Sequence, residues 1–349
     1  MSHLTFAEAG VVGLLQGITE LFPVSSLGHA VLIPAIVGGQ WAQDLDVSRA
    51  ESPYLAYIVG LHVATALAMI AFFWRDWIRI IGAFFASLWH VIAPEPGTRR
   101  FEPQGTDQTL AWMIIIATIP VGIAGLLLEH TFRTVFSKPI LTSSFLFVNG
   151  LILLGGEARR RRGAAAESLQ VAADQQLVAQ RQTAAVAAGG PGAIGGGRHS
   201  SGQRAVKQEQ AGLAVAADRR LTGLGFVTAF FLGAGQILAL LPGISRDGTV
   251  MVSGMFRGLT RQDAARFSFL LSAPVIFAAG LLKIKDLTGP LAAGIRGQVL
   301  FGSLLSFIGA YLALRFLVSY LSKSSRTLTP FAIYCLAAGL GAFVYLTVK

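Results

Sequence analysis

A cluster of polar residues interrupts the first apolar segment of the chain, and it limits the available folds more than any other feature. Residues 16–29 contain a carboxylate, an amide, hydroxyls and an imidazole between apolar flanks. Polar groups at membrane depth are costly unless they face one another, a cavity or a substrate. Pro23 and Gly28 interrupt the helix here, and neither flank has the roughly 20 apolar residues that a spanning helix needs. The pattern predicts a re-entrant helical hairpin, residues 6–37, with a buried irregular turn.

The composition places the rest of the chain in a membrane as well. Hydrophobic residues make up 53% of the chain and charged residues 13%, whereas soluble domains carry about 25% charged residues. This composition indicates a polytopic helical membrane protein. The net charge of +10 is accounted for by Lys and Arg on cytoplasmic loops, so we expect no nucleic-acid partner.

The same plan occurs twice along the chain. A second apolar segment, 221–255, is broken at 242–249 by Pro, Gly, Ser, Arg and Asp. We therefore predict an all-α polytopic fold of two repeats, 1–156 and 221–349, each with a re-entrant hairpin and three spanning helices. An odd number of crossings makes the repeats inverted, and paired broken segments then point to a site near the midplane. The six predicted spanning helices are 53–74, 109–128, 139–156, 267–282, 299–318 and 329–348.

Residues 157–220 separate the two halves and differ from them in composition. They are rich in Ala, Gln, Gly and Arg, with a basic excess. Ala and Gln favour a weak helix over 164–188, and the Gly-rich stretch favours flexibility. We interpret the segment as a flexible cytoplasmic linker; a regulatory or partner-binding arm is the alternative. With the linker inside the cell, basic residues concentrate on the cytoplasmic loops, which predicts both termini outside.

The first hairpin offers candidate metal ligands and a candidate nucleophile. Gln16 and Glu20 are four residues apart and share a helix face, so their oxygens suit Mg²⁺ or Ca²⁺. Pairing of Glu20 with an arginine, or capping of a helix, is the alternative. Ser25 and Ser26 begin the second half-helix, where serine caps and free N–H groups bind phosphate. Ser26 and His29 are three residues apart, either as nucleophile and base or with His29 as a general acid.

The second hairpin offers an anion-binding group. Arg246 presents a planar fork of donors that matches phosphate oxygens. A structural salt bridge to Glu20 or Asp247 is the alternative. Asp247 is unusual in an anion site, and three roles are open to it: to orient Arg246, to cap the half-helix, or to ligate a metal. Outside the hairpins, His62 and Thr65 fit either support of the site or satisfied core positions.

The two hairpins resemble the signatures of the undecaprenyl-diphosphate phosphatase family, the bacitracin-resistance type. Residues 16–20, Gln-Gly-Ile-Thr-Glu, and 23–29, Pro-Val-Ser-Ser-Leu-Gly-His, are similar to the first signature. Residues 242–246, Pro-Gly-Ile-Ser-Arg, are similar to the second. The chain departs from the family pattern at Asp247, where a serine is usual, and in the length of its central insert.

The resemblance implies a phosphatase of the bacterial plasma membrane, with its active site open to the outer face. It would convert undecaprenyl diphosphate to the monophosphate, recycle the cell-wall carrier lipid and confer bacitracin resistance. A divalent cation, Mg²⁺ or Ca²⁺, is implied as cofactor, held with the diphosphate by Glu20 and Gln16. Ser26 would be the nucleophile, His29 its acid/base partner, and Arg246 the phosphoryl-binding group. The further phosphate-binding residues would be Ser25, Gly243, Ser245 and Thr249.

A flippase or transporter for a lipid phosphate is the main alternative, because inverted broken-helix repeats are a transporter architecture. The Ser, His, Glu and Arg set favours chemistry, since a carrier needs an anion site but no nucleophile. A catalytically weak paralogue with a sensing role is a third interpretation. The expected partners are a polyprenyl diphosphate lipid and the bilayer, and a homo-oligomer is compatible with the sequence.

Overall fold

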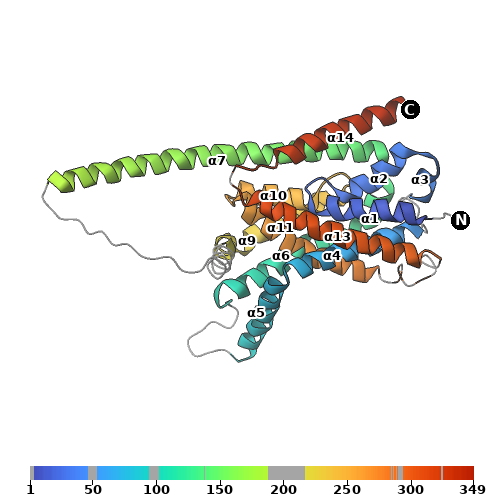
Figure 1. Ribbon diagram of the computed structural model, residues 1–349. Helices are drawn as coiled ribbons and strands as arrows, with labels where there is room; N and C mark the ends of the chain where they lie inside the picture. The colour runs from blue at the N-terminus through green and yellow to red at the C-terminus, as the bar shows by residue number, and fades with distance from the viewer. Residues whose placement is uncertain are drawn as a thin grey trace, which may run out of the picture.

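The computed structural model is helical throughout the part of the chain that it describes (Figure 1). The described residues are 4–45, 53–93, 102–136, 138–187, 217–283, 285, 287, 289, 294–323 and 325–349. The first half holds α1 (Phe6–Leu21), α2 (Ser26–Val37), α3 (Gly39–Asp44), α4 (Pro53–Phe72), α5 (Trp74–Ile92), α6 (Gly105–Val135) and α7 (Pro139–Ala187). The second half holds α9 (Gly225–Ala234), the 3₁₀ helix η1 (Gly235–Leu240), α10 (Arg246–Phe256), α11 (Arg261–Leu282), α13 (Arg296–Leu321) and α14 (Thr329–Val348).

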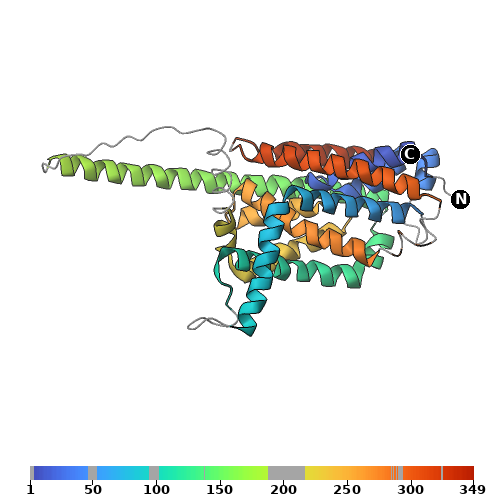
Figure 2. The ribbon, with the colours of Figure 1, turned by 60° about the horizontal axis from the view of Figure 1, so that its bottom comes forward.

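Five of these helices are long and apolar enough to cross a bilayer. They are α6, α7, α11, α13 and α14, and the pair α4–α5 would add a sixth span if the two were counted together. This set confirms the prediction of an all-α polytopic membrane protein. The axes of α4 and α5 differ by 86°, so α5 leaves the bundle steeply at Phe73 (Figures 1 and 2).

Helix α7 is much longer than the predicted span 139–156. It continues to Ala187 and projects from the bundle (Figure 1). The arginines and the Ala/Gln-rich run after residue 156 are good helix formers, so nothing in the sequence stops the helix there. The start of the predicted linker 157–220 is therefore helical, and residues 188–216 lie outside the described residues.

Both ends of the predicted linker belong to the folded body of the protein. The carboxylate of Glu157 is buried and accepts two hydrogen bonds from Arg261, at 2.7 and 2.6 Å. Asp218 is also buried, and it accepts hydrogen bonds from Arg79 at 2.5 Å and from Arg266 at 3.2 Å. Charged groups can be buried in this way because they are paired. Residues 157 and 218 therefore belong to the bundle, and the linker between them is shorter than the predicted 157–220.

The helices of the two halves are interleaved. Helix α1 packs against α13, and α9 packs against α6. Both contacts bring backbones together: a Cβ atom at Gly13 or Gly17 would collide with the backbone of α13, and one at Gly233 with that of α6. Small residues allow such close approach between membrane helices. Helices α7 and α14 also pack side by side, as do α4 and α11.

Candidate functional site

The site forms where the turns of the two broken hairpins touch. The first turn lies between α1 and α2 and the second between η1 and α10. Ser25, at the start of α2, has a positive φ of 68°. Its hydroxyl accepts hydrogen bonds from the backbone N–H of Gly28 at 3.2 Å and from that of Gly243 at 3.1 Å. Ser25 therefore caps its own helix and binds the opposite turn.

Asn149 on α7 is a second link between the turns. It is fully buried; its Nδ2 donates to the Pro23 carbonyl at 2.9 Å, and its Oδ1 accepts from the Ser245 N–H at 3.0 Å. The side chain of Ser245 caps α10 through the Gly248 N–H at 3.1 Å. Sequence reasoning missed Asn149, for which the only signal was one amide within an apolar spanning segment.

Glu20, near the end of α1, is at the centre of the site. Its buried carboxylate accepts hydrogen bonds from Gln16 Nε2 at 2.9 Å and from the Ser26 hydroxyl. Its other oxygen forms an ion pair with Arg246 from the second hairpin. The structure thus brings together four residues that the sequence proposed for the site.

Arg246 is only partly satisfied by this ion pair. One terminal nitrogen donates to Glu20, whereas Nε is buried and has no hydrogen-bond partner among the described residues. A buried donor left unpaired costs about 1–3 kcal/mol. The salt bridge that the sequence offered as an alternative to phosphate binding is present, yet the guanidinium keeps a donor available for an anion.

His62 on α4 also reaches the site. Its Nε2 lies 3.3 Å from Gln16 Nε2 and 3.5 Å from Glu20 Oε2. Its Nδ1 donates to the Ile58 carbonyl at 2.9 Å, which leaves Nε2 facing the site. Thr65 instead donates to the backbone carbonyl of His62 at 2.8 Å. Of the two residues that the sequence left open, His62 lies in the site and Thr65 does not.

His29 is turned away from the hydroxyl of Ser26. Its Nδ1 donates to the Ser25 carbonyl at 2.7 Å, and its Nε2 lies 2.7 Å from the hydroxyl of Tyr334 on α14. The two rings stack with centroids 5.7 Å apart. A carbonyl can only accept, so in the neutral ring Tyr334 donates to Nε2 and both nitrogens are engaged. The Ser26–His29 pair expected from their spacing is not formed, because Ser26 bonds to Glu20 instead.

The side chains of Asp247 and Thr249 also form their hydrogen bonds outside the cluster around Glu20. The carboxylate of Asp247 accepts hydrogen bonds from Ser268 at 2.6 Å and Ser272 at 2.7 Å, both on α11. The hydroxyl of Thr249 donates to the Arg246 carbonyl within α10 at 2.8 Å. Asp247 therefore ties α10 to α11, and the hydroxyl of Thr249 is used inside its own helix.

Among the described residues there is no group of three or more His, Cys, Asp or Glu side chains placed to hold a metal ion. The donors near the centre of the site are the Glu20 carboxylate, the Gln16 amide and the His62 imidazole. Two of the three offer oxygen atoms, which are the ligands that hard divalent cations prefer.

Comparison with known proteins agrees with the motifs. Residues 9–190 and 202–341 match the family model described as bacitracin resistance protein BacA. An undecaprenyl-diphosphatase of Mycolicibacterium paratuberculosis is 51% identical over 100% of this chain and 99% of its own length. An undecaprenyl-diphosphatase 2 of Frankia alni is 50% identical over 97% of each chain. One of Burkholderia orbicola is 36% identical over 94% of this chain and 92% of its own.

Proposed function

We propose, because the chain belongs to the BacA family of bacitracin resistance proteins, that it is an undecaprenyl-diphosphatase. It would remove the terminal phosphate of undecaprenyl diphosphate in the membrane and so recycle the cell-wall carrier lipid. One observation carries this proposal: Glu20, Ser26 and Arg246 converge from two hairpins that lie more than 200 residues apart in the chain. Phosphoryl transfer needs this kind of positioning and charge neutralisation.

In the proposed reaction, Ser26 is the nucleophile and Glu20 its base. The hydrogen bond from Ser26 to Glu20 points the hydroxyl proton at a carboxylate that can take it. The serine oxygen bonds to the terminal phosphorus, and the bridging P–O bond breaks. Undecaprenyl phosphate leaves with the bridging oxygen, while the serine proton passes to Glu20. Water then attacks the phosphorus of the phosphoserine and the Oγ–P bond breaks; Glu20 returns its proton to the serine oxygen, and inorganic phosphate leaves with the oxygen of the water.

Arg246 binds the phosphoryl oxygens in this scheme. Its unpaired Nε and its terminal nitrogens supply donors for oxygens that carry the transferred charge. The substrate would compete with Glu20 for the guanidinium, which would free the carboxylate to accept the proton of Ser26. His29 has no direct part in the proton transfer, because its two nitrogens are bonded to Ser25 and Tyr334.

The proposed cofactor is a divalent cation held by Glu20 and Gln16. Gln16 donates from its Nε2 to Glu20 at 2.9 Å, so its amide would turn to offer Oε1 beside the Glu20 carboxylate, and phosphate oxygens of the substrate would complete the coordination of Mg²⁺ or Ca²⁺. When bound, the cation would help to neutralise the diphosphate. We also propose that the site opens to the outer face of the bacterial plasma membrane, with both termini outside and the central insert in the cytoplasm, from the distribution of basic residues.

The packing of the helices supports two inverted repeats. Helix α1 opens the first half and packs on α13, the second span of the other half; α9 packs in the same way on α6. Each contact uses glycines of the hairpin helix. Helices α7 and α14, the last of each half, pack on one another, as do α4 and α11. An approximate two-fold axis between the hairpins would produce all of these pairs.

Phosphate release by the purified protein in detergent tests the proposed function. With undecaprenyl diphosphate and Mg²⁺ or Ca²⁺, the wild type should release phosphate and chelation should stop it. Ser26→Ala and Arg246→Ala should lose at least 10²-fold in rate, as is typical for groups of this kind. Ser144→Ala is the control and should be fully active, because among the described residues the Ser144 hydroxyl bonds only to the Ile140 carbonyl of its own helix.

The outcomes separate the alternatives. No phosphate release by folded wild type would leave the flippase or transporter interpretation in place. Full activity of Arg246→Ala would refute the assignment of the anion site. If Ser26→Ala keeps more than about a tenth of the rate, a water molecule activated by Glu20 replaces the serine as nucleophile.

A further inference from the structure

The backbone of Ser25 adopts a strained conformation directly before Ser26. Its φ of 68° and ψ of 98° lie where L-residues are rarely found, and Ser25 is the one non-glycine residue with a positive φ in the described part of the chain. Such a conformation persists only where the surrounding structure holds it, and it occurs most often at functional sites. The groups that hold Ser25 are therefore candidates for a part in the reaction.

Hydrogen bonds hold Ser25 at both its side chain and its carbonyl. The hydroxyl oxygen accepts from the backbone N–H groups of Gly28 and Gly243, which uses both of its acceptor positions. The carbonyl accepts from the backbone N–H of His29 at 3.2 Å and from the ring Nδ1 of His29 at 2.7 Å. The ring makes the shortest of these contacts, and it is the only side chain among these donors.

The carbonyl that His29 holds determines the position of Ser26. It belongs to the peptide group that joins Ser25 to Ser26, and this group is planar, so a fixed carbonyl also fixes the N and Cα atoms of Ser26. From that position the hydroxyl of Ser26 donates to Glu20. A displacement of about 1 Å at a reacting group can cost about 10²-fold in rate. The bond from His29 to Ser25 therefore controls the geometry of the nucleophile, although His29 is not bonded to its hydroxyl.

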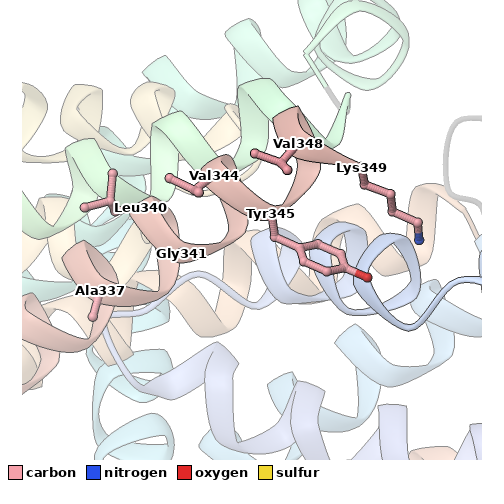
Figure 3. Close-up of a pocket in the computed structure, with 7 residues that line it drawn as sticks. All are labelled: Ala337, Leu340, Gly341, Val344, Tyr345, Val348 and Lys349. Carbon is pink, nitrogen blue, oxygen red and sulfur yellow. The ribbon is translucent and has the colours of Figure 1, made fainter.

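Tyr334 holds the ring of His29 at its second nitrogen. The tyrosine hydroxyl lies 2.7 Å from Nε2, and the two rings stack. Tyr334 is on α14, whose later turns appear in Figure 3; the shallow pocket drawn there is lined by residues of this helix from Ala337 to Lys349 and contains no residue of the site. Because the side chain of His29 is buried and both nitrogens are bonded, the imidazole is fixed with Nδ1 toward Ser25.

We propose that His29 is a positioning residue, which orients the nucleophile Ser26 by holding the carbonyl of Ser25. The proposal rests on the proposed function, in which Ser26 attacks the terminal phosphorus. In this role the imidazole is a fixed N–H donor and exchanges no proton during the reaction. The requirement at position 29 is then a donor at the place of Nδ1, and not an imidazole as such.

Two amide substitutions separate this role from acid–base catalysis. The Nδ2 of asparagine takes the place of histidine Nδ1, the Nε2 of glutamine takes that of histidine Nε2, and neither amide is an acid or a base near neutral pH. His29→Asn can therefore still donate to Ser25, whereas His29→Gln can bond only toward Tyr334. With undecaprenyl diphosphate in detergent, the kcat of His29→Gln should fall about 10²-fold with KM nearly unchanged. His29→Asn should recover most of that loss.

Tyr334→Phe is the matched control. It removes the bond to Nε2 of the same ring and keeps the bond from Nδ1 to Ser25, so its kcat should stay within about tenfold of wild type. His29→Ala should resemble His29→Gln in kcat. The thermal unfolding midpoint in detergent identifies the folded variants, and the comparison of the two amides carries the test if His29→Ala is unstable.

Equal losses of kcat in His29→Asn and His29→Gln would overturn the proposal, because they would show that the imidazole itself is required. A raised KM with unchanged kcat in His29→Gln would also overturn it, since His29 would then act on substrate binding. An inactive wild type would instead refute the proposed function.

Discussion

Replacement of Asn149 by leucine would separate the two hairpin turns without opening a large cavity, because the two side chains are similar in size. Asn149 is fully buried, and its amide bonds to the Pro23 carbonyl at 2.9 Å and to the Ser245 N–H at 3.0 Å. Leucine would leave the Ser245 N–H buried and unpaired, and it would leave the Pro23 carbonyl with only the weak thiol donor of Cys335 at 3.9 Å. An unpaired buried group costs about 1–3 kcal/mol, so the loss should be at least of that size.

This loss should appear in activity as well as in stability. Pro23 precedes the helix that carries Ser26, and Ser245 directly precedes Arg246. A shift of about 1 Å between the turns would misalign nucleophile and anion site, and such a displacement can cost 10²-fold. Phosphate release should therefore fall by about that factor, and the thermal unfolding midpoint in detergent should also fall.

Thr142→Val on the same helix is the matched control for Asn149→Leu. Thr142 is buried, and its hydroxyl has no hydrogen-bond partner in the described part of the chain, so its removal should cost nothing. Asn149→Asp keeps an acceptor for Ser245 but loses the donor to Pro23, and it should be impaired as well. An Asn149→Leu protein with wild-type kcat/KM and unfolding midpoint would refute the reasoning.

Three further predictions concern the frame of the site. Arg261→Ala should destabilise the protein by about 3–5 kcal/mol in thermal unfolding, because it leaves the buried Glu157 carboxylate without its cation; an unchanged midpoint would contradict this. Tyr334→Phe removes one hydrogen bond to His29, worth about 1 kcal/mol, so kcat/KM should fall less than about tenfold, and a hundredfold loss would give His29 a direct role. Deletion of much of 163–215, which removes the projecting part of α7 together with the segment after it, should leave phosphate release intact in folded protein; a loss of activity would refute the linker interpretation.

The convergence of the hairpins could be predicted because the signals are local. Pro23 and Gly28 break one apolar segment, Pro242 and Gly243 break the other, and polar groups at membrane depth must find one another. Which side chains contact one another inside the site depends on how each helix is rotated about its own axis. A spacing of three residues on a helix allows Ser26 and His29 to touch, but it does not establish that they do. The actual partner of His29 lies on α14, 305 residues away.

The direction of α5 depends on packing that composition does not encode. Its residues are apolar enough to read as an extension of α4, and one exposed face carries Trp74, Ile78, Phe85 and Trp89. The opposite face packs on α6, where the indole of Trp112 donates to the Ser87 hydroxyl at 3.0 Å. This contact accompanies the 86° bend between α4 and α5. The sequence of one helix taken by itself does not predict such a bend.

Asp247 shows how a second carboxylate is accommodated beside the anion site. A carboxylate beside Arg246 would compete with phosphate if it faced the guanidinium. Here two hydroxyls, those of Ser268 and Ser272, hold the carboxylate against α11, and its place in the first turn of α10 favours negative charge. Glu20 is therefore the carboxylate that pairs with Arg246. Asp247 thus anchors the second hairpin to α11 and leaves the anion site to Arg246 and its partner Glu20.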